Sequence, residues 1–145
     1  MWIILIGFGM IALTVAIHTM GSSLWFEFTS RRLMKLGPQN KLPPLFQILS
    51  TTAVVLLSLH LFEALLWALL YMQLPDQGGL ANLDEALYFS MVTFTSLGYG
   101  DITMSEGWRS LAGMEAMVGI VVFGLTAAML FAIIQRAWQY QHSKN

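Results

Sequence analysis

Three long apolar stretches and one short amphipathic stretch organise the chain. The long stretches run from Trp2 to about Phe26, from Leu45 to Met72 and from Ser110 to Ala137. Each is long enough to cross, as a helix, a hydrocarbon core about 30 Å thick. The pattern therefore predicts an all-α membrane protein with three transmembrane helices.

The short stretch, from Asn82 to about Thr95, is predicted to be a helix that enters the membrane without crossing it. Asn82 is a suitable N-cap, and Glu85 follows three residues later in capping-box register. The apolar part is too short to span the bilayer. A re-entrant helix of this kind is tolerated only where protein or water surrounds it, and its negative C-terminal end then favours a cation in the interior.

The five residues after this helix have glycine at alternate positions: Ser96, Leu97, Gly98, Tyr99 and Gly100. Gly98 and Gly100 can adopt positive φ angles, so successive carbonyl oxygens can turn toward one side. Carbonyl oxygens around an axis can replace the water around a dehydrated cation. One chain offers one such loop and a ring needs several copies, so we expect a symmetric homo-oligomer.

The segment from Ala86 to Asp101 resembles the pore helix and selectivity filter of tetrameric potassium channels, in particular the small bacterial module of two helices and a pore loop. The resemblance covers roughly Leu45 to Trp138 and leaves an extra N-terminal transmembrane helix outside it. It implies a homotetramer around a central pore, with a re-entrant pore helix and filter loop. It also implies K⁺ as the permeant ion, with no cofactor.

Two filter positions depart from the family pattern. Ser96 takes the place of the innermost threonine and keeps the hydroxyl, but it lacks the methyl group that stiffens χ1. Leu97 takes the place of a valine and changes the packing behind the filter, although its coordinating atom is a backbone carbonyl. Gly98, Tyr99 and Gly100 match identically. A weakly selective or nonselective monovalent cation channel is therefore the alternative to a potassium-selective one.

The predicted boundaries follow from the apolar pattern and the resemblance. The extra transmembrane helix covers 1–28, a cytoplasmic linker 29–44, the pore module 45–138 and a cytoplasmic tail 139–145. The module contains an outer helix at 45–72, the pore helix at 82–95, the filter at 96–100 and an inner helix at 110–137. Prolines and glycine in the linker prevent one helix from running through it, and a short surface helix is expected near Ser30–Leu36.

Residues beside the filter are expected to support it or to move with the gate. In the family an aromatic donor often braces the aspartate that follows the filter, and Tyr88 and Asp101 occupy these places, with Thr95 adjoining the filter. The alternative is an interfacial tyrosine and a solvated carboxylate. Gly119 resembles the gating hinge of the inner helix, whereas Gly124 suits a hinge or close helix packing equally well.

Ionisable residues inside the spans predict a buried polar network. His60 and Glu63 share one face of the second span, and Glu115 lies at a similar depth in the third. Two carboxyl groups at this depth either are unconnected or include one that is protonated or neutralised by His60. His18 is expected to hydrogen-bond to a neighbouring helix rather than to sense protons. A metal site needs more ligands than His60 and Glu63, so no metal besides K⁺ in the filter is expected.

The composition supports a membrane protein without a redox or thiolate site. Of the 145 residues, 57% are hydrophobic and 10% are charged, whereas soluble domains carry about 25% charged residues. There is no cysteine, which excludes disulfides and thiolate metal ligands. The N-terminus lacks the basic region and cleavage site of a signal peptide, so we expect a retained span.

The distribution of basic residues predicts the orientation. Only Arg109 lies on the side of the re-entrant loop, and six basic residues lie on the other: Arg31, Arg32, Lys35, Lys41, Arg136 and Lys144. The positive-inside rule places these six in the cytoplasm. We therefore expect a multi-pass protein of the cell inner (plasma) membrane, with the N-terminus outside and the C-terminus cytoplasmic.

The sequence thus predicts a passive potassium-selective channel and no enzyme. The carbonyl oxygens of residues 96–99 and the Ser96 hydroxyl would coordinate K⁺. The expected partners are K⁺, the lipid bilayer and further copies of the chain, and no nucleic acid. Two other classes remain: a non-conducting accessory subunit, and an intramembrane enzyme built on His60, Glu63 and Glu115. The enzyme lacks a nucleophile motif and leaves the glycine-rich loop unexplained.

Overall fold

A computed structural model of the chain describes residues 2–35, 45–75, 80 and 82–142. It contains four helices: α1 (Trp2–Lys35), α2 (Leu45–Tyr71), α3 (Leu83–Phe94) and α4 (Arg109–His142). Within these residues there is no strand. Three helices are long and apolar enough to cross a membrane, over Trp2–Arg32, Phe46–Tyr71 and Arg109–Arg136. The all-α membrane architecture with three spans is therefore confirmed.

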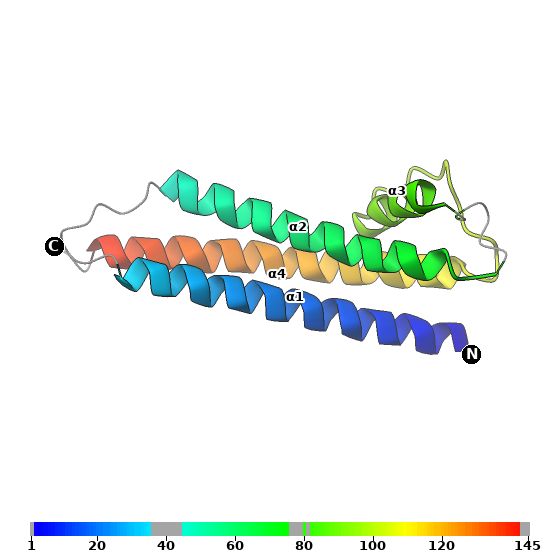
Figure 1. Ribbon diagram of the computed structural model, residues 1–145, viewed down its shortest axis with the longest axis horizontal. Helices are drawn as coiled ribbons and strands as arrows, with labels where there is room; N and C mark the ends of the chain where they lie inside the picture. The colour runs from blue at the N-terminus through cyan, green and yellow to red at the C-terminus, as the bar shows by residue number, and fades with distance from the viewer. Residues whose placement is uncertain (1, 36–44, 76–79, 81, 143–145) are drawn as a thin grey trace.

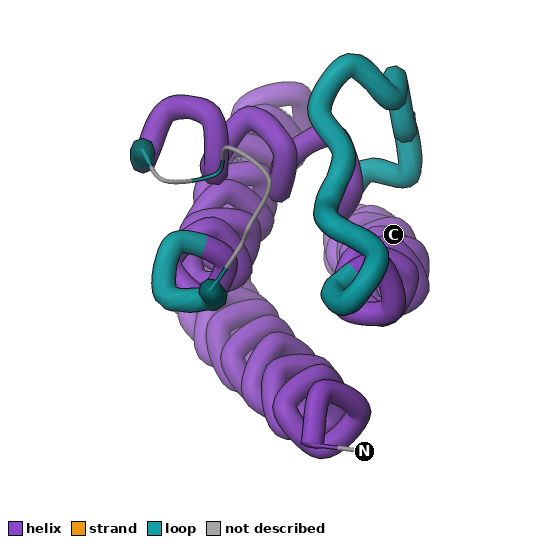
Figure 2. Tube along the Cα trace, turned by 90° about the vertical axis from the view of Figure 1, so that its right-hand side faces the viewer, coloured by secondary structure: helices purple, strands orange, loops and turns teal. Residues whose placement is uncertain are grey.

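The three long helices run side by side, and α3 packs at one end of them (Figure 1). The N-terminal end of α1 lies at the same end as α3, whereas the C-terminal ends of α1 and α4 lie at the opposite end. In the view along the helices, the loop after α3 leads over to the start of α4 (Figure 2). The N-terminus and the predicted filter loop thus share one end of the molecule.

Two helices run farther than the predicted boundaries. α1 continues beyond Phe26 to Lys35, so the surface helix expected near Ser30–Leu36 is the last part of α1 as far as the structure describes it. α4 continues beyond Ala137 to His142, through most of the predicted tail. Neither extension contains glycine or proline, so nothing in the chain ends the helices there. Residues 36–44 of the predicted linker lie outside the described residues.

α1 is attached to α2 by polar contacts as well as by apolar packing. The indole N–H of Trp67 donates to the hydroxyl of Thr14 over 3.1 Å, and the indole N–H of Trp25 donates to Thr52 over 3.1 Å. Hydrogen bonds between helices satisfy polar groups that neither water nor lipid reaches. The extra helix is therefore fixed in register against α2.

The core lies where α2, α3 and α4 meet. Fully buried side chains there include Trp67, Tyr71, Phe94 and Leu111. In contrast, many large apolar side chains on the outer faces of the long helices are exposed, such as Leu5, Phe46 and Ile120. An apolar exterior of this extent suits a lipid environment or contact with further copies of the chain.

Candidate functional site

The loop predicted to form the filter begins with the C-terminal turn of α3. The backbone N–H of Ser96 donates to the carbonyl of Thr93 over 2.9 Å, and that of Leu97 donates to Val92 over 3.0 Å. These two bonds are those of a Schellman motif, which ends a helix with one residue in the left-handed conformation. That residue is Ser96, with a φ angle of 59°.

The sign of the φ angle alternates from residue to residue along the loop. Ser96, Gly98 and Gly100 have positive φ angles of 59°, 55° and 77°, whereas Leu97 and Tyr99 do not. Alternation of left-handed and right-handed residues turns successive N–H groups to one side and the carbonyl groups to the other. The two glycines behave as the sequence predicted. The positive φ at Ser96 was missed, although its position directly after a helix end was a signal for it.

The loop is exposed in the single chain. Leu97 and Tyr99 have 59% and 68% of their surface accessible, and a Cβ added at Gly98 or Gly100 would meet no atom within 4 Å. Their positive φ angles, and not lack of space, therefore call for glycine at these two positions. In the single chain the loop is open and does not enclose an ion.

The far end of the loop is also attached to α3. The hydroxyl of Tyr88 donates to Oδ2 of Asp101 over 2.6 Å, so the hydrogen bond expected between these two residues is present. It lowers the pKa of the Asp101 carboxyl and raises the pKa of the Tyr88 hydroxyl, because it stabilises the charged form of the one and the protonated form of the other. Thr95 points back into the helix and donates to the Met91 carbonyl over 2.7 Å.

Glu115 of α4 faces α3 and is fully buried. Its Oε2 accepts a hydrogen bond from the Tyr71 hydroxyl of α2, and its Oε1 contacts the Ser90 hydroxyl of α3, both over 2.5 Å. The Ser90 hydroxyl also lies 2.6 Å from the carbonyl oxygen of Ala64. One carboxyl group thus joins α2, α3 and α4.

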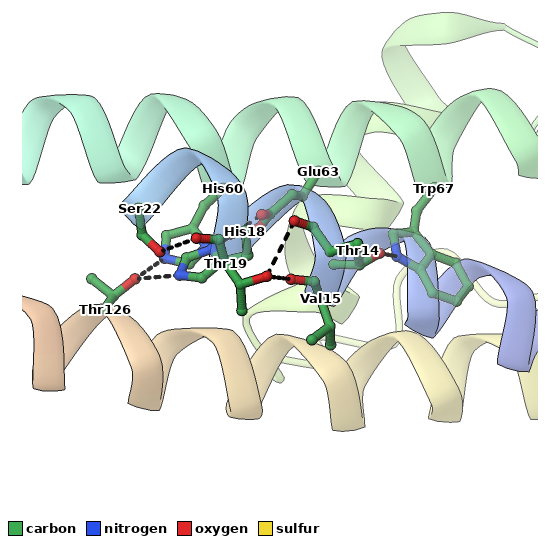
Figure 3. A network of polar contacts seen from close by, with 10 residues as sticks. Thr14, Val15, His18, Thr19, Ser22, His60, Glu63, Trp67 and Thr126 are labelled. Carbon is green, nitrogen blue, oxygen red and sulfur yellow. Dashed lines mark hydrogen bonds and ion pairs between the residues drawn. The ribbon is translucent and has the colours of Figure 1, made fainter. Parts of the chain in front are cut away.

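A second buried cluster joins α1 to α2 (Figure 3). Glu63 lies between two histidines: its Oε1 is 3.1 Å from Nδ1 of His18, and its Oε2 is 3.2 Å from Nδ1 of His60. Thr126 of α4 faces the other sides of both rings, 2.9 Å from Nε2 of His60 and 3.4 Å from Nε2 of His18. His18 thus contacts a neighbouring helix, as expected. Thr126 was not predicted, since a single threonine in an apolar span gives no signal.

The predicted trio of His60, Glu63 and Glu115 therefore separates into two clusters. Among the described residues, no hydrogen bond links Glu115 to either His60 or Glu63. Each carboxyl group has its own donors, so the two do not compete for the same proton.

The two candidate hinge glycines differ in their surroundings. A Cβ built on Gly119 would overlap the carbonyl oxygen of Phe94, the last residue of α3, whereas a Cβ on Gly124 would meet no atom within 4 Å. Close contact between α4 and the end of α3 therefore explains the glycine at position 119. In the single chain, packing does not explain the one at 124.

Comparison with known proteins points in one direction. The model of a family described as "Ion channel" matches residues 45–136, more than half of the chain. Two curated relatives are cyclic nucleotide-gated potassium channels, from Rhizobium etli and Mesorhizobium japonicum. Each is 40% identical over 57 residues, which is 39% of this chain and 16% of the relative. The match thus spans about a sixth of each relative. No solved structure matches the chain at a significant level.

Proposed function

Because the chain belongs to the ion channel family, we propose that it forms a passive, potassium-selective pore. The observation that carries this proposal is the alternation of positive and negative φ angles along residues 96–100, because such a backbone can turn consecutive carbonyl groups to one side. Both curated relatives are named as potassium channels. Membership of this family makes the protein a channel rather than an enzyme.

In this proposal, conduction requires only that oxygen atoms of the protein replace the hydration water of the ion. The carbonyl oxygens of residues 96–99 and the Ser96 hydroxyl take the place of hydration water, and ions move by displacing one another between adjacent sites. α3 supports this, because the partial negative charge at its C-terminal end lies directly before the loop. The Tyr88–Asp101 hydrogen bond holds the outer end of the loop against the same helix.

Four copies of the chain complete the pore. The exposed loop supports this assignment, since a single chain leaves the filter open. In the tetramer α4 lines the inner cavity. Gly124, which lacks a packing reason in the single chain, is a better candidate for a gating hinge than Gly119.

The charges support an orientation with α3 outside. Three of the four described arginines, Arg31, Arg32 and Arg136, belong to the ends of α1 and α4 that lie far from α3, whereas Arg109 begins α4 at the end where α3 lies. The positive-inside rule places these ends in the cytoplasm and the N-terminal end of α1 outside. The membrane is then the plasma membrane of the cell.

Current through purified protein in a planar bilayer, with K⁺ on one side and Na⁺ on the other, tests the proposal. We expect a reversal potential near the potassium limit. Gly98→Ala should abolish the current, because alanine is strained at a φ of 55°. Gly9→Ala is the matched control, since Gly9 lies in α1 with open space around its Cα, and it should conduct normally.

A weakly selective cation pore is the second candidate, because Ser96 and Leu97 depart from the family pattern. Current that reverses near zero would favour it. If the protein carries no current and does not bind K⁺ in calorimetry, the chain is an accessory subunit and the proposal fails.

A further inference from the structure

A cluster of three ionisable side chains lies outside the proposed ion path. It consists of His18 on α1 and of His60 and Glu63 on α2, and we call it the His–Glu cluster (Figure 3). The relative exposure of its members is 0%, 5% and 0%. Ionisable groups at such depth in a membrane protein are costly unless they have a partner or a function.

The spacing of the cluster suits a metal ion. One ligand atom from each residue can be chosen so that all three lie within 4.8 Å of one another. The two Nδ1 atoms lie 3.1 and 3.2 Å from the carboxylate oxygens of Glu63. In a tetrahedral zinc site with bonds of 2.0–2.1 Å, neighbouring ligand atoms are about 3.3 Å apart. The two separations run to different oxygens of Glu63. With one carboxylate oxygen as the ligand, one separation already matches an edge of such a site, and the third ligand atom lies within 4.8 Å of the other two.

With Glu63 ionised and both rings neutral, the contacts around the cluster lack one hydrogen, and a bound cation or one added proton removes this deficit. If both Nδ1 atoms donate to Glu63, both neutral rings present Nε2 as an acceptor to Thr126, whose hydroxyl has a single hydrogen. If both Nδ1 atoms instead bind a cation, both Nε2 atoms carry hydrogen and donate to Thr126 Oγ1, which accepts two bonds. Metal-ligating histidines commonly donate their second ring N–H to an oxygen acceptor in this way.

We propose that His18, His60 and Glu63 bind a transition-metal ion of the Zn²⁺ type. Two imidazoles and one carboxylate suit this class of ion, and three protein ligands leave a fourth position for water. Sequence reasoning placed only His60 and Glu63 on one helical face, which is too few ligands for a metal site, and His18 lies on another helix. The packing of α1 against α2 supplies the third ligand. The ion would fasten α1 to the part of the chain that matches the channel family, whether or not the pore conducts K⁺.

Titration with Co²⁺ tests the proposal on the intact protein, purified without a histidine tag and treated with a chelator. We expect one Co²⁺ per chain, with the intense visible absorption of a four-coordinate site. His18→Gln and Glu63→Gln should each weaken binding by more than the roughly 10- to 100-fold loss that removal of an outer-shell partner causes. Glu115→Gln is the matched control, because it changes a buried carboxyl of the other cluster, and it should bind as the wild type does.

Absorption of X-rays by Zn²⁺ bound to the wild-type protein needs no variant and covers the case in which a substitution prevents folding. We expect two imidazole ligands at about 2.0–2.1 Å. Absence of Co²⁺ binding by the wild type, equal binding by all variants, or fewer than two imidazoles around the zinc would each overturn the proposal. The missing cation would then be a proton on one histidine ring.

Discussion

Ser96 combines two roles in one residue. It is the left-handed residue that ends α3, and it is the first of the five residues whose carbonyl groups are proposed to face the ion. Glycine would fit the backbone but provides no hydroxyl, and a β-branched residue fits a positive φ angle poorly. This gives a physical reason for serine where the resembling family has threonine.

We therefore expect Ser96→Thr to lower the melting temperature of the purified protein. The strain of a non-glycine residue in the left-handed region is of order 1–3 kcal/mol, and the β-branch adds to it. Ser96→Gly is the control, because it relieves the strain and should melt no lower than the wild type. A Ser96→Thr protein as stable as the wild type would contradict the left-handed conformation at this position.

The Tyr88–Asp101 hydrogen bond leads us to expect that the loop loses stability at acidic pH. Because Tyr88 lowers the pKa of Asp101 in the folded state, this bond stabilises the loop above the usual pKa of an aspartate. The stabilisation is lost as the pH falls through the lowered pKa. In Tyr88→Phe, the Asp101 pKa should rise toward its ordinary range, as measured by NMR of labelled carboxyl groups. An Asp101 pKa that is equal in the wild type and in Tyr88→Phe would argue against the hydrogen bond.

At this scale, sequence reasoning succeeded where a contact follows from local spacing. The Asn82 side chain accepts from the N–H of Glu85 over 2.9 Å, as the capping pattern predicted. Asp101 and Tyr88 followed from the family resemblance. Thr126 and His18 lie 108 positions apart, so their contact depends on how α1 and α4 pack, which residue spacing does not encode.

Among the elements, α3 is fixed to α4 by the contact between Ser90 and Glu115. The Ser90 hydroxyl contacts both Ala64 and Glu115 but has one hydrogen. Both contacts are hydrogen bonds only if the Glu115 carboxyl carries a proton. A neutral acid there fits a fully buried position between three helices, where no basic side chain among the described residues forms an ion pair with it.

Glu115→Ala should therefore destabilise the protein more than Glu115→Gln. Alanine leaves the buried Tyr71 hydroxyl without an acceptor, which costs about 1–3 kcal/mol, and it also creates a cavity. Glutamine can donate to Ser90 and accept from Tyr71, so it mimics the protonated acid. Thermal unfolding in detergent compares the two variants. A Glu115→Gln protein as unstable as Glu115→Ala would mean that Glu115 is ionised.

The lengths of the elements explain which of their ends could be predicted. Apolar length revealed all three spans, and polarity and capping revealed α3. The helix ends far from α3 were predicted at the expected membrane boundary, whereas α1 and α4 continue to Lys35 and His142. α1 is apolar around most of its circumference, so its pattern did not indicate which face meets α2.

At the scale of the whole molecule, the single chain is incomplete as a pore. The filter loop is open, and apolar side chains on α4 such as Ile120 and Val121 are exposed. Native mass spectrometry of the detergent-solubilised protein should show four chains per particle. Gly98→Ala should keep this assembly while losing current, which would separate a damaged filter from a failed tetramer. A monomeric wild type would contradict the proposed pore.

The two attachments of the filter loop have a mechanical consequence. The Schellman turn at Ser96 and the Asp101–Tyr88 hydrogen bond both fix the loop to α3. The loop and α3 thus form one rigid body. α4 touches this body where Gly119 meets Phe94, and Glu115 adds a second coupling beside it. Bending of α4 beyond Gly119 would then leave the loop undistorted, so in the proposed pore a gate at the end of α4 far from α3 would open and close without altering which ion the loop accepts.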